Sequence, residues 1–182
     1  MNTERWEIDS SHSSIHFSVR HLVIAKVRGQ FSRWTGTVTV PEQDFARASL
    51  SVVIDAASID TGVADRDAHL RSADFFDVER FPEITFTAKN VTRVASDRLR
   101  LEGALTIKGI THDVVLDVES LGTAKDPWGN ERAAFSATTA VDRKAFGLTW
   151  NQVLETGGVM VGDRIEITID IEAVRQAATK VA

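Results

Sequence analysis

The feature that most constrains the fold of this chain is a strict alternation of apolar and polar residues. Along residues 165–172, isoleucine stands at every second position, with Glu, Thr, Asp and Glu between them. Successive side chains of a β-strand point to opposite faces of the sheet, so this period of two predicts a strand with one apolar and one polar face. We therefore expect a sheet that buries one face and exposes the other.

The same alternation recurs along most of the chain and predicts about eight strands. It is found in residues 6–8, 15–20, 31–40, 50–54, 84–89, 99–107, 114–119, 133–141 and 165–172. Connections between these stretches are short, which favours antiparallel neighbours because parallel pairs need long crossovers. About eight strands is also the size at which a closed barrel either fills with its own side chains or holds one small ligand. We expect an all-β, eight-stranded antiparallel barrel, with a two-sheet sandwich as the alternative.

Length and local signals fit a single domain. The 182 residues suit one all-β barrel, expected over residues 1–175, and residues 176–182 have few large apolar side chains and are expected to form a frayed tail. Gly29 and Gly36 would weaken a flat strand, so they predict bends or bulges. The run DPWGN at 126–130 is the strongest loop signal in the chain.

Residues 61–77, TGVADRDAHLRSADFFD, interrupt the alternation. Residues 65–71 are compatible with a short helix, and the bulky pair Phe75 and Phe76 follows it. Asp65 and Asp67 lie two apart on that helix and would not face each other, so charge compensation at the helix N-terminus explains them better than acid–base catalysis. We interpret the segment as a short helical insertion whose phenyl groups close one end of the barrel.

Composition excludes several classes of protein. The net charge is −5 with both signs interspersed, whereas nucleic-acid binding needs a clustered cationic face. There is no cysteine, which excludes disulfides, thiolate metal sites and a cysteine nucleophile. No apolar run approaches the length of a membrane span, and the N-terminus carries no apolar signal segment, so we expect a cytoplasmic location without stable membrane insertion.

No catalytic or metal-binding motif is present in the sequence. It has no GxSxG elbow, P-loop or HExxH, and we expect no catalytic residue, metal or cofactor. His12 and His16 would lie about 13 Å apart on a strand, too far to chelate one ion. A site assembled from the distant residues His21, His69 and His112 is the alternative, either as metal ligands or as a general base.

The aromatic residues are more informative than the charged ones. The chain has nine Phe and four Trp but no Tyr, which is a largely apolar aromatic set. Among the residues that fall outside the regular strand patterns are Phe75, Phe76, Phe146 and Trp150. They either pack as small clusters under loops or line and close an apolar cavity.

Several segments together resemble the YceI-like family of bacterial lipid-binding proteins. They are HSSIHFSVRH, RDAHLRSADFFDVERFPEITF, LTIKGITHDVVLDV, DRKAFGLTWN and GGVMVGDRIEITIDIEA, in this order. The resemblance extends from about Trp6 to about Ala173, and its most specific parts are RDxHL…FFD…PxITF and DRxxFG. It implies an extended lipocalin-like barrel with an elongated apolar tunnel, and it makes a homodimer plausible.

The resemblance also implies a function. Family members are associated with polyisoprenoids or isoprenoid quinones, without established catalytic chemistry. We therefore expect non-enzymatic binding, storage or transport of a long apolar amphiphile, with such a lipid as the only bound group. The alternatives are an enzyme that acts on such a lipid with a histidine base, and a self-filled barrel that serves as an interaction module.

Candidate site residues follow from placing the alternation in that barrel. One face of each strand looks inward, which gives nine wall candidates: Phe17, Val19, Val38, Val52, Ile54, Phe86, Leu101, Leu105 and Phe135. The candidates for the mouth or cap are Phe75, Phe76, Phe146 and Trp150. Arg66, His69 and Arg71 are the nearest polar groups for a pyrophosphate or quinone head.

Overall fold

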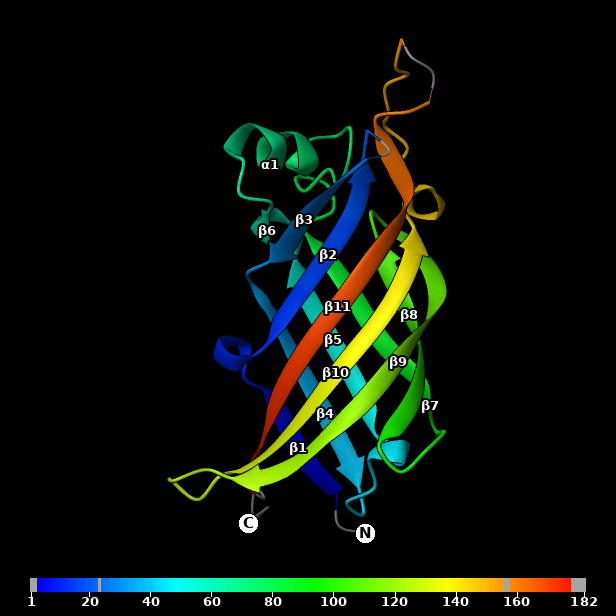
Figure 1. Ribbon diagram of the computed structural model, residues 1–182. Helices are drawn as coiled ribbons and strands as arrows, with labels where there is room; N and C mark the ends of the chain where they lie inside the picture. Colours follow the sequence, from blue (N-terminus) through cyan, green and yellow to red (C-terminus); the bar gives the residue numbers. More distant parts are fainter. Residues whose placement is uncertain (1–2, 23, 156–157, 178–182) are drawn as a thin grey trace.

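The structure, a computed structural model, describes residues 3–22, 24–155 and 158–177, and its strands wrap around a central axis (Figure 1). The strands in this part of the chain are β1 (Thr3–Ile8), β2 (Ser14–His21), β3 (Ala25–Phe31), β4 (Trp34–Pro41), β5 (Ser49–Asp55), β6 (Ile59–Asp60), β7 (Glu83–Arg93), β8 (Arg98–Ile107), β9 (Ile110–Lys125), β10 (Glu131–Asp142) and β11 (Val161–Arg175). The helices are α1 (Ala64–Arg71) and the short 3-10 helices η1 (Ser10–His12), η2 (Phe45–Arg47), η3 (Ala56–Ser58) and η4 (Arg143–Phe146).

The sheet closes into a barrel because β1 pairs on both sides. Trp6 is in register with Val38 of β4 and with Arg175 of β11. The described strands fill eight positions in the wall, three of them by consecutive pairs: β1 with β2, β3 with β4, and β5 with β6. All neighbouring strands are antiparallel. This confirms the eight-stranded antiparallel barrel, and the sandwich alternative is wrong.

A bend between β3 and β4 corrects the prediction of one strand over residues 31–40. The backbone N–H of Ser32 donates to the Ser58 carbonyl at 3.2 Å, and the N–H of Arg33 donates to Ser58 Oγ at 3.1 Å. Ser58 is itself buried. These contacts turn the chain, so that β3 pairs with β2 and β4 pairs with β1. The prediction missed β3 because charged residues and a glycine interrupt its apolar pattern.

Gly29 and Gly36 lie inside regular strands, so the bulge prediction is wrong at both positions. A Cβ on Gly29 would lie 2.4 Å from Phe17 Cζ, and a Cβ on Gly36 would lie 2.5 Å from Ile8 Cδ1. The register shifts lie elsewhere, in the β7–β8, β9–β10 and β11–β2 pairs. The two glycines instead leave space inside the barrel for large side chains of neighbouring strands.

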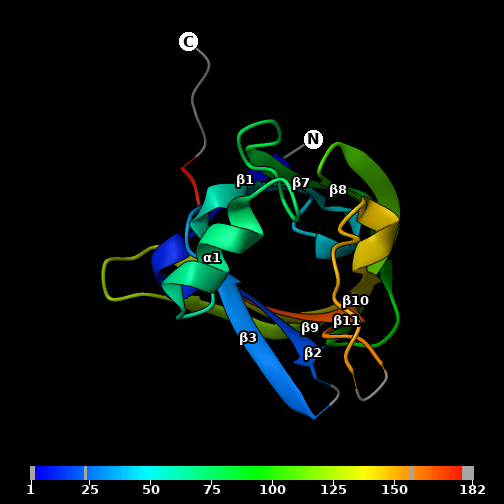
Figure 2. The same cartoon turned by 90° about the horizontal axis from the view of Figure 1, so that it is seen from above.

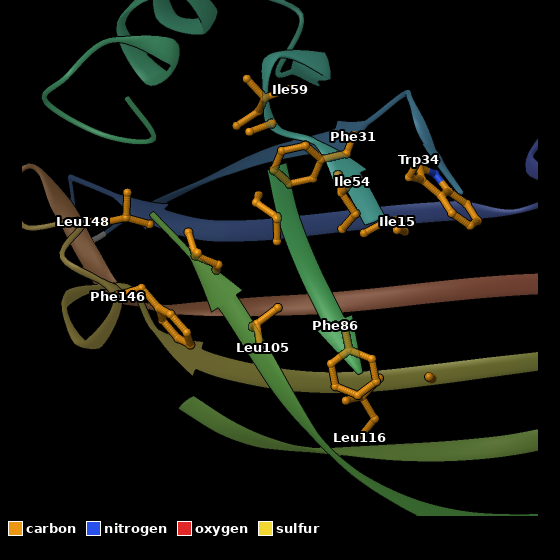
Figure 3. Packing of buried hydrophobic residues seen from close by; sticks show 14 of the residues in the cluster. Ile15, Phe31, Trp34, Ile54, Ile59, Phe86, Leu105, Leu116, Phe146 and Leu148 are labelled. Carbon is orange, nitrogen blue, oxygen red and sulfur yellow. The ribbon is translucent and has the colours of Figure 1, made fainter. Parts of the chain in front are cut away.

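The apolar face of the sheet lies inside the barrel. Figure 3 shows Phe31, Ile54, Phe86, Leu105 and Leu116 pointing from different strands into the same interior. Each is less than a tenth exposed. The inward positions are the apolar members of the alternation, so the period of two in the sequence determines which residues surround the barrel axis.

The predicted tail at residues 176–182 falls mostly outside the described residues, which include only its first two positions. There, the N–H of Gln176 donates to the carbonyl of Arg5 at 2.8 Å. In the described ranges, no helix has the length and apolar character needed to cross a membrane.

We expect Gly103→Ala to destabilise the barrel. A Cβ on Gly103 would lie 2.4 Å from Phe86 Cζ and 2.7 Å from the Thr87 carbonyl oxygen, and the backbone atom has no freedom to yield. Overpacking of this kind costs about 1–3 kcal/mol. The free energy of unfolding, measured by urea denaturation, should fall by that amount.

Gly162→Ala is the matched control, because a Cβ there would meet its nearest neighbour, the Arg20 carbonyl oxygen, at an ordinary 3.4 Å. Its free energy of unfolding should stay constant or rise by up to about 1 kcal/mol. Equal losses in the two variants would contradict the close packing of Phe86 on β8.

Candidate ligand-binding cavity

An apolar cavity of about 290 Å³ occupies the interior of the barrel. Its lining is almost entirely carbon and comes from every position in the wall. On β11 the lining extends from Val161 to Ile171, so the cavity follows ten residues of this strand. At about 3.3 Å per residue and a tilt of about 40° from the axis, this corresponds to about 25 Å along the barrel. The cavity is a narrow tunnel.

The structure places the nine wall candidates in the lining of this tunnel. They are Phe17, Val19, Val38, Val52, Ile54, Phe86, Leu101, Leu105 and Phe135. They converge because each occupies the apolar member of an alternating pair, and the closed sheet turns all of those faces inward. Their contact with a ligand stays a prediction.

Residues 61–77, which we call the cap, lie at one end of the barrel, with α1 over one side of the rim (Figures 1 and 2). Phe75, Phe76 and Leu70 of the cap line the tunnel together with Phe146 of η4. The ring of Phe76 packs edge-on against Phe31 of β3 with centroids 5.9 Å apart. The cap therefore supplies apolar side chains to the end of the tunnel.

His69 and Trp150 lie behind this lining and do not contribute to it. The His69 ring packs edge-on against Trp150 and Phe75, with centroid distances of 4.7 and 5.1 Å. Its Nε2 is 2.8 Å from the Asp74 carboxylate. These contacts position Phe75 from outside the tunnel.

Arg66 and Arg71 also lie outside the tunnel lining. Arg71 holds the cap on the barrel, whereas Arg66 braces the cap internally. Arg71 donates to the carbonyl oxygens of Ala57 and Ile59, at 2.8 and 3.0 Å. Arg66 donates to the hydroxyl and the carbonyl oxygen of Thr61, at 2.7 and 2.9 Å. Several of their N–H groups are thus already bonded to neighbouring chain, and their role at a lipid head group stays a prediction.

The carboxylate of Asp67 attaches the polar helix α1 to Thr61, the first residue of the cap. This carboxylate is buried and accepts hydrogen bonds from the N–H and the hydroxyl of Thr61, at 2.9 and 2.5 Å. Charge compensation at the helix N-terminus, as predicted from the sequence, therefore describes only part of the role of this residue. Buried carboxylates need such donors, since an unpaired charge is costly away from water.

Arg143 is a tunnel-lining residue that the sequence reasoning missed. Its side chain is 3% exposed. The guanidinium donates to the carbonyl oxygens of Gly162, Leu148 and Trp150, at 2.8, 2.5 and 2.9 Å. Burial lowers the pKa of this group from its ordinary value, while Asp163 opposes the shift. In the sequence, only the position of Arg143 in the DRxxFG element pointed to this residue. In the structure, its hydrogen bonds join the segment after η4 to the start of β11.

The three histidines of the metal and general-base alternatives are not brought together. The His69 ring contacts Asp74, and His112 Nε2 lies 2.9 Å from the Ala145 carbonyl oxygen. His21 ends β2, in register with Val161. Among the described residues, these histidines do not belong to a group with metal-ligand spacing.

One group with such spacing does occur in the described chain, formed by Asp9, His12 and Glu172. Arg132 already supplies a cation there: its guanidinium contacts Glu172 and lies 3.0 Å from Asp9 and 2.9 Å from Asp126. We interpret the group as an ion network that joins η1, the 126–130 loop and β11.

At the end of the tunnel remote from the cap, η2 places Phe45 in the lining. The Phe45 ring lies between Phe135 and Trp6, with centroid distances of 5.1 and 5.6 Å. A second, polar hollow lies beyond Phe45 and includes Glu4 and Lys125. Phe45 thus separates the apolar tunnel from a polar surface.

Comparison with known proteins gives a consistent result. The family model of the YceI-like domain matches residues 6–173. A UPF0312 protein of Staphylococcus aureus is 38% identical over 165 residues, which cover 90% of this chain and 94% of the relative.

Solved structures share the fold. The YCEI protein of Campylobacter jejuni is 32% identical, with a TM-score of 0.73 over 87% of this chain and 90% of its own. BcnA of Burkholderia cenocepacia has a TM-score of 0.79 at 21% identity and covers 91% and 98% of the two chains. A polyisoprenoid-binding domain from Saccharophagus degradans has a TM-score of 0.68 at 16% identity over 94% and 98%. At these last two identities the likeness concerns the fold alone.

The ion network generates a prediction about acid stability. Hydrogen bonds from Ser11, then His12 and Arg132, lower the pKa of Asp9, and those from Asn130 and Arg132 lower the pKa of Asp126 to about 2. Carboxyls with lowered pKa values stabilise the fold above their unfolded pKa of about 4, and this stabilisation is lost as the pH falls toward the folded value. Arg132→Gln should therefore be less stable than the unaltered protein at neutral pH, and the difference should narrow below about pH 4.

Urea denaturation at several pH values measures this difference. Arg100→Gln is the control, because Arg100 pairs only with the exposed Glu102 at 3.3 Å. Exposed pairs contribute little, so its effect should be small at every pH. A destabilisation by Arg132→Gln that stays constant down to about pH 3 would contradict the coupling of Arg132 to these two carboxyls.

Proposed function

The chain belongs to the YceI-like domain family, and from this premise we propose that it binds a long apolar amphiphile in its tunnel and carries or stores it without chemical change. The proposed ligand is a polyisoprenoid, an isoprenoid quinone or a similar lipid. The observation that supports this most strongly is the tunnel itself: about 290 Å³ lined by carbon from all sides of the barrel.

The volume favours a binding protein over a self-filled barrel. Protein interiors are close-packed, and their few voids are rarely larger than a water molecule. Even an apolar cavity of about 150 Å³ binds small hydrocarbons. The tunnel is about twice that size and close to the lower limit of ordinary ligand pockets. Side chains that merely supported a fold would be expected to fill it.

The shape favours a long linear ligand. The tunnel follows the barrel axis for about 25 Å, whereas the hydrocarbon core of a bilayer, which holds two acyl chains end to end, is about 30 Å thick. The tunnel is therefore longer than one ordinary acyl chain. Each buried CH₂ contributes about 0.8 kcal/mol, so a long chain gains affinity without any specific polar contact.

The likeness to a polyisoprenoid-binding domain agrees with this choice of ligand class. Isoprenoid chains carry regularly spaced methyl branches, and the lining of Ile, Leu, Val and Phe offers an irregular apolar surface on which such branches pack. A role for Arg66, His69 and Arg71 at the head group, a homodimer and a cytoplasmic location stay predictions.

A catalytic role has weaker support from the described residues. The histidines that it would use lie apart, and each of His69 and His112 is engaged with a neighbour. None of the three lines the tunnel. We therefore propose binding alone, and a turnover assay with a bound prenyl lipid would test that part separately.

Native mass spectrometry of the freshly purified protein tests the proposed function directly. We expect a complex whose extra mass matches one long-chain lipid and which disappears after organic extraction. The extracted protein should then bind an added polyprenol or isoprenoid quinone. Recovery of no lipid, together with no binding of either added ligand, would contradict the proposal.

Replacement of the cap phenyl groups tests the tunnel end. Phe75→Ser/Phe76→Ser removes two lining side chains and admits water, and each buried phenyl contributes about 1.5–3 kcal/mol. We expect the affinity for an added polyprenol to fall at least tenfold. Phe76→Ser alone, at a half-buried position, should lower the affinity in the same direction with less effect on folding.

Phe81→Ser is the matched control, because Phe81 packs near Gly109 and Arg80 and does not line the tunnel. Its lipid affinity should equal that of the unaltered protein. If the folded cap variants also keep full affinity, the cap does not close the binding site.

A further inference from the structure

Four large apolar side chains are exposed on two segments at the cap end of the barrel, outside the tunnel. Leu22 and Ile24, at the turn between β2 and β3, are 40% and 89% exposed. Val153 and Val159, in the arm that precedes β11, are 78% and 42% exposed. We call these four residues the apolar edge.

The two segments lie side by side. The N–H of Leu22 donates to the carbonyl of Met160 at 2.9 Å, and His21 is in register with Val161. Val153 and Val159 face each other across a bridge that holds the arm together. Figures 1 and 2 show the turn and the arm adjacent from both directions, projecting beyond the barrel. The apolar edge is therefore one surface feature.

Exposed cations flank the apolar edge on the outside of the same strands. They are Arg20 on β2, Lys26 and Arg28 on β3, and Arg164 on β11. Arg20 is directly opposite Lys26 in the β2–β3 pair. Within the described chain, Arg20, Arg28 and Arg164 make no ion pair, while Lys26 pairs with Glu166 at 3.3 Å. Like charges opposed on a strand pair are unfavourable unless another charge meets them.

The charge of this region differs in sign from that of the whole chain. The four cations and the acid Glu166 together carry a net charge of +3, whereas the net charge of the whole chain is −5. Nearby, Asp163 contacts Lys144 and Arg143, and Glu155 is an exposed acid on the arm. The region thus attracts anions, even though the protein as a whole is acidic.

From this combination we propose that the cap end of the barrel docks onto an anionic lipid bilayer. The apolar edge enters the boundary between headgroups and acyl chains, and the four cations contact lipid phosphates. Single exposed apolar residues are ordinary on protein surfaces. A cluster of them flanked by Lys and Arg has the chemistry by which proteins bind the surface of an anionic membrane.

Because the apolar edge lies beside the end of the tunnel, docking there would allow a lipid to pass between bilayer and tunnel. This step rests on the proposed function. Val161 lines the tunnel and is paired with His21, the residue before Leu22. A bilayer bound at the apolar edge would meet the end of the tunnel directly. An apolar chain would then move between bilayer and tunnel without exposing its length to water, which is unfavourable for apolar surface.

The opposite end of the barrel supplies an internal control. Trp128, in the loop between β9 and β10, is 81% exposed, so it resembles the apolar edge in exposure. Its neighbours differ: the N–H of Trp128 donates to Asp126, whose carboxylate belongs to the ion network with Arg132. Val94, between β7 and β8, and Leu121 of β9 are also exposed toward this end, at 62% and 60%. Within the described residues, however, it offers no comparable set of cations without ion pairs.

Flotation of the full chain with vesicles tests the proposal. One set of vesicles contains phosphatidylcholine alone, and the other contains in addition roughly one-third phosphatidylglycerol, at an ionic strength of about 0.1 M. We expect binding to the anionic vesicles only, and a loss of binding in high salt. Ile24→Asp and Val153→Asp should each reduce binding at least tenfold, because both place a charge at an exposed apolar position.

Arg20→Gln/Arg28→Gln tests the electrostatic part. Each cation near an anionic surface contributes about 1 kcal/mol, or about fivefold in affinity, so the double variant should bind roughly 25 times more weakly. Trp128→Asp is the matched control and should bind like the unaltered protein. All these positions are exposed, so circular dichroism should report unchanged folding.

The outcomes separate this proposal from the proposed function. Phe76→Ser should lose lipid from the tunnel yet still float with anionic vesicles, because it leaves the apolar edge intact. Docking is overturned if the unaltered protein floats with neither vesicle, if Ile24→Asp and Val153→Asp bind normally, or if Trp128→Asp alone abolishes binding. Each of these results leaves the mass of any co-purified lipid, and hence the proposed function, untouched.

Discussion

The closure of the sheet by β1 is the constraint on which the rest of the structure depends. Because β1 pairs with β4 on one side and with β11 on the other, the described strands have an inside and an outside. Every strand must then send alternate side chains to the axis, and the apolar members occupy those positions. A wall of eight positions is wide enough either to be filled by these side chains or to hold one ligand. In this barrel the side chains leave a cavity of about 290 Å³ along the axis.

The two ends of the barrel are built differently. At one end Phe45 packs between Trp6 and Phe135, and the Arg132 network fixes the surrounding loops. At the other end the cap contributes side chains to the tunnel lining. It is a separate segment that Arg71 holds by hydrogen bonds to the carbonyl oxygens of Ala57 and Ile59 rather than by strand pairing. A segment attached in this way opens at lower cost than the sheet, so the proposed ligand would exchange at the cap end.

The wall of the tunnel was predictable from the sequence because the signal is local. A residue such as Phe86 or Leu105 points inward for the same reason that its neighbours point outward, and only the closure of the sheet had to be assumed. The helix in the cap was also predictable from its interrupted pattern. Bends were not: the turn at Ser32 depends on Ser58, which lies far along the chain.

Polar side chains were the least predictable part of the site. Arg71, whose role at a head group stays a prediction, also donates to the Ala57 and Ile59 carbonyls, which the sequence did not indicate. Arg143 was not selected, although it is buried and lines the tunnel. Both outcomes depend on which backbone carbonyls lack partners at a strand end, and this is decided by tertiary contacts. The sequence alone does not show whether a charged side chain contacts a ligand or forms hydrogen bonds with the protein's own backbone.

If a long chain runs along the barrel axis, as proposed, a bulky side chain in the middle of the tunnel should block it. Ala137 lines the tunnel on β10, whereas Ala140 on the same strand does not. Native mass spectra of Ala137→Phe and Ala140→Phe, each shown to be folded, should differ. We expect Ala137→Phe to retain no lipid or only a shorter one, and Ala140→Phe to retain the same lipid as the unaltered protein. Equal retention of the same long lipid by both variants would contradict the proposal.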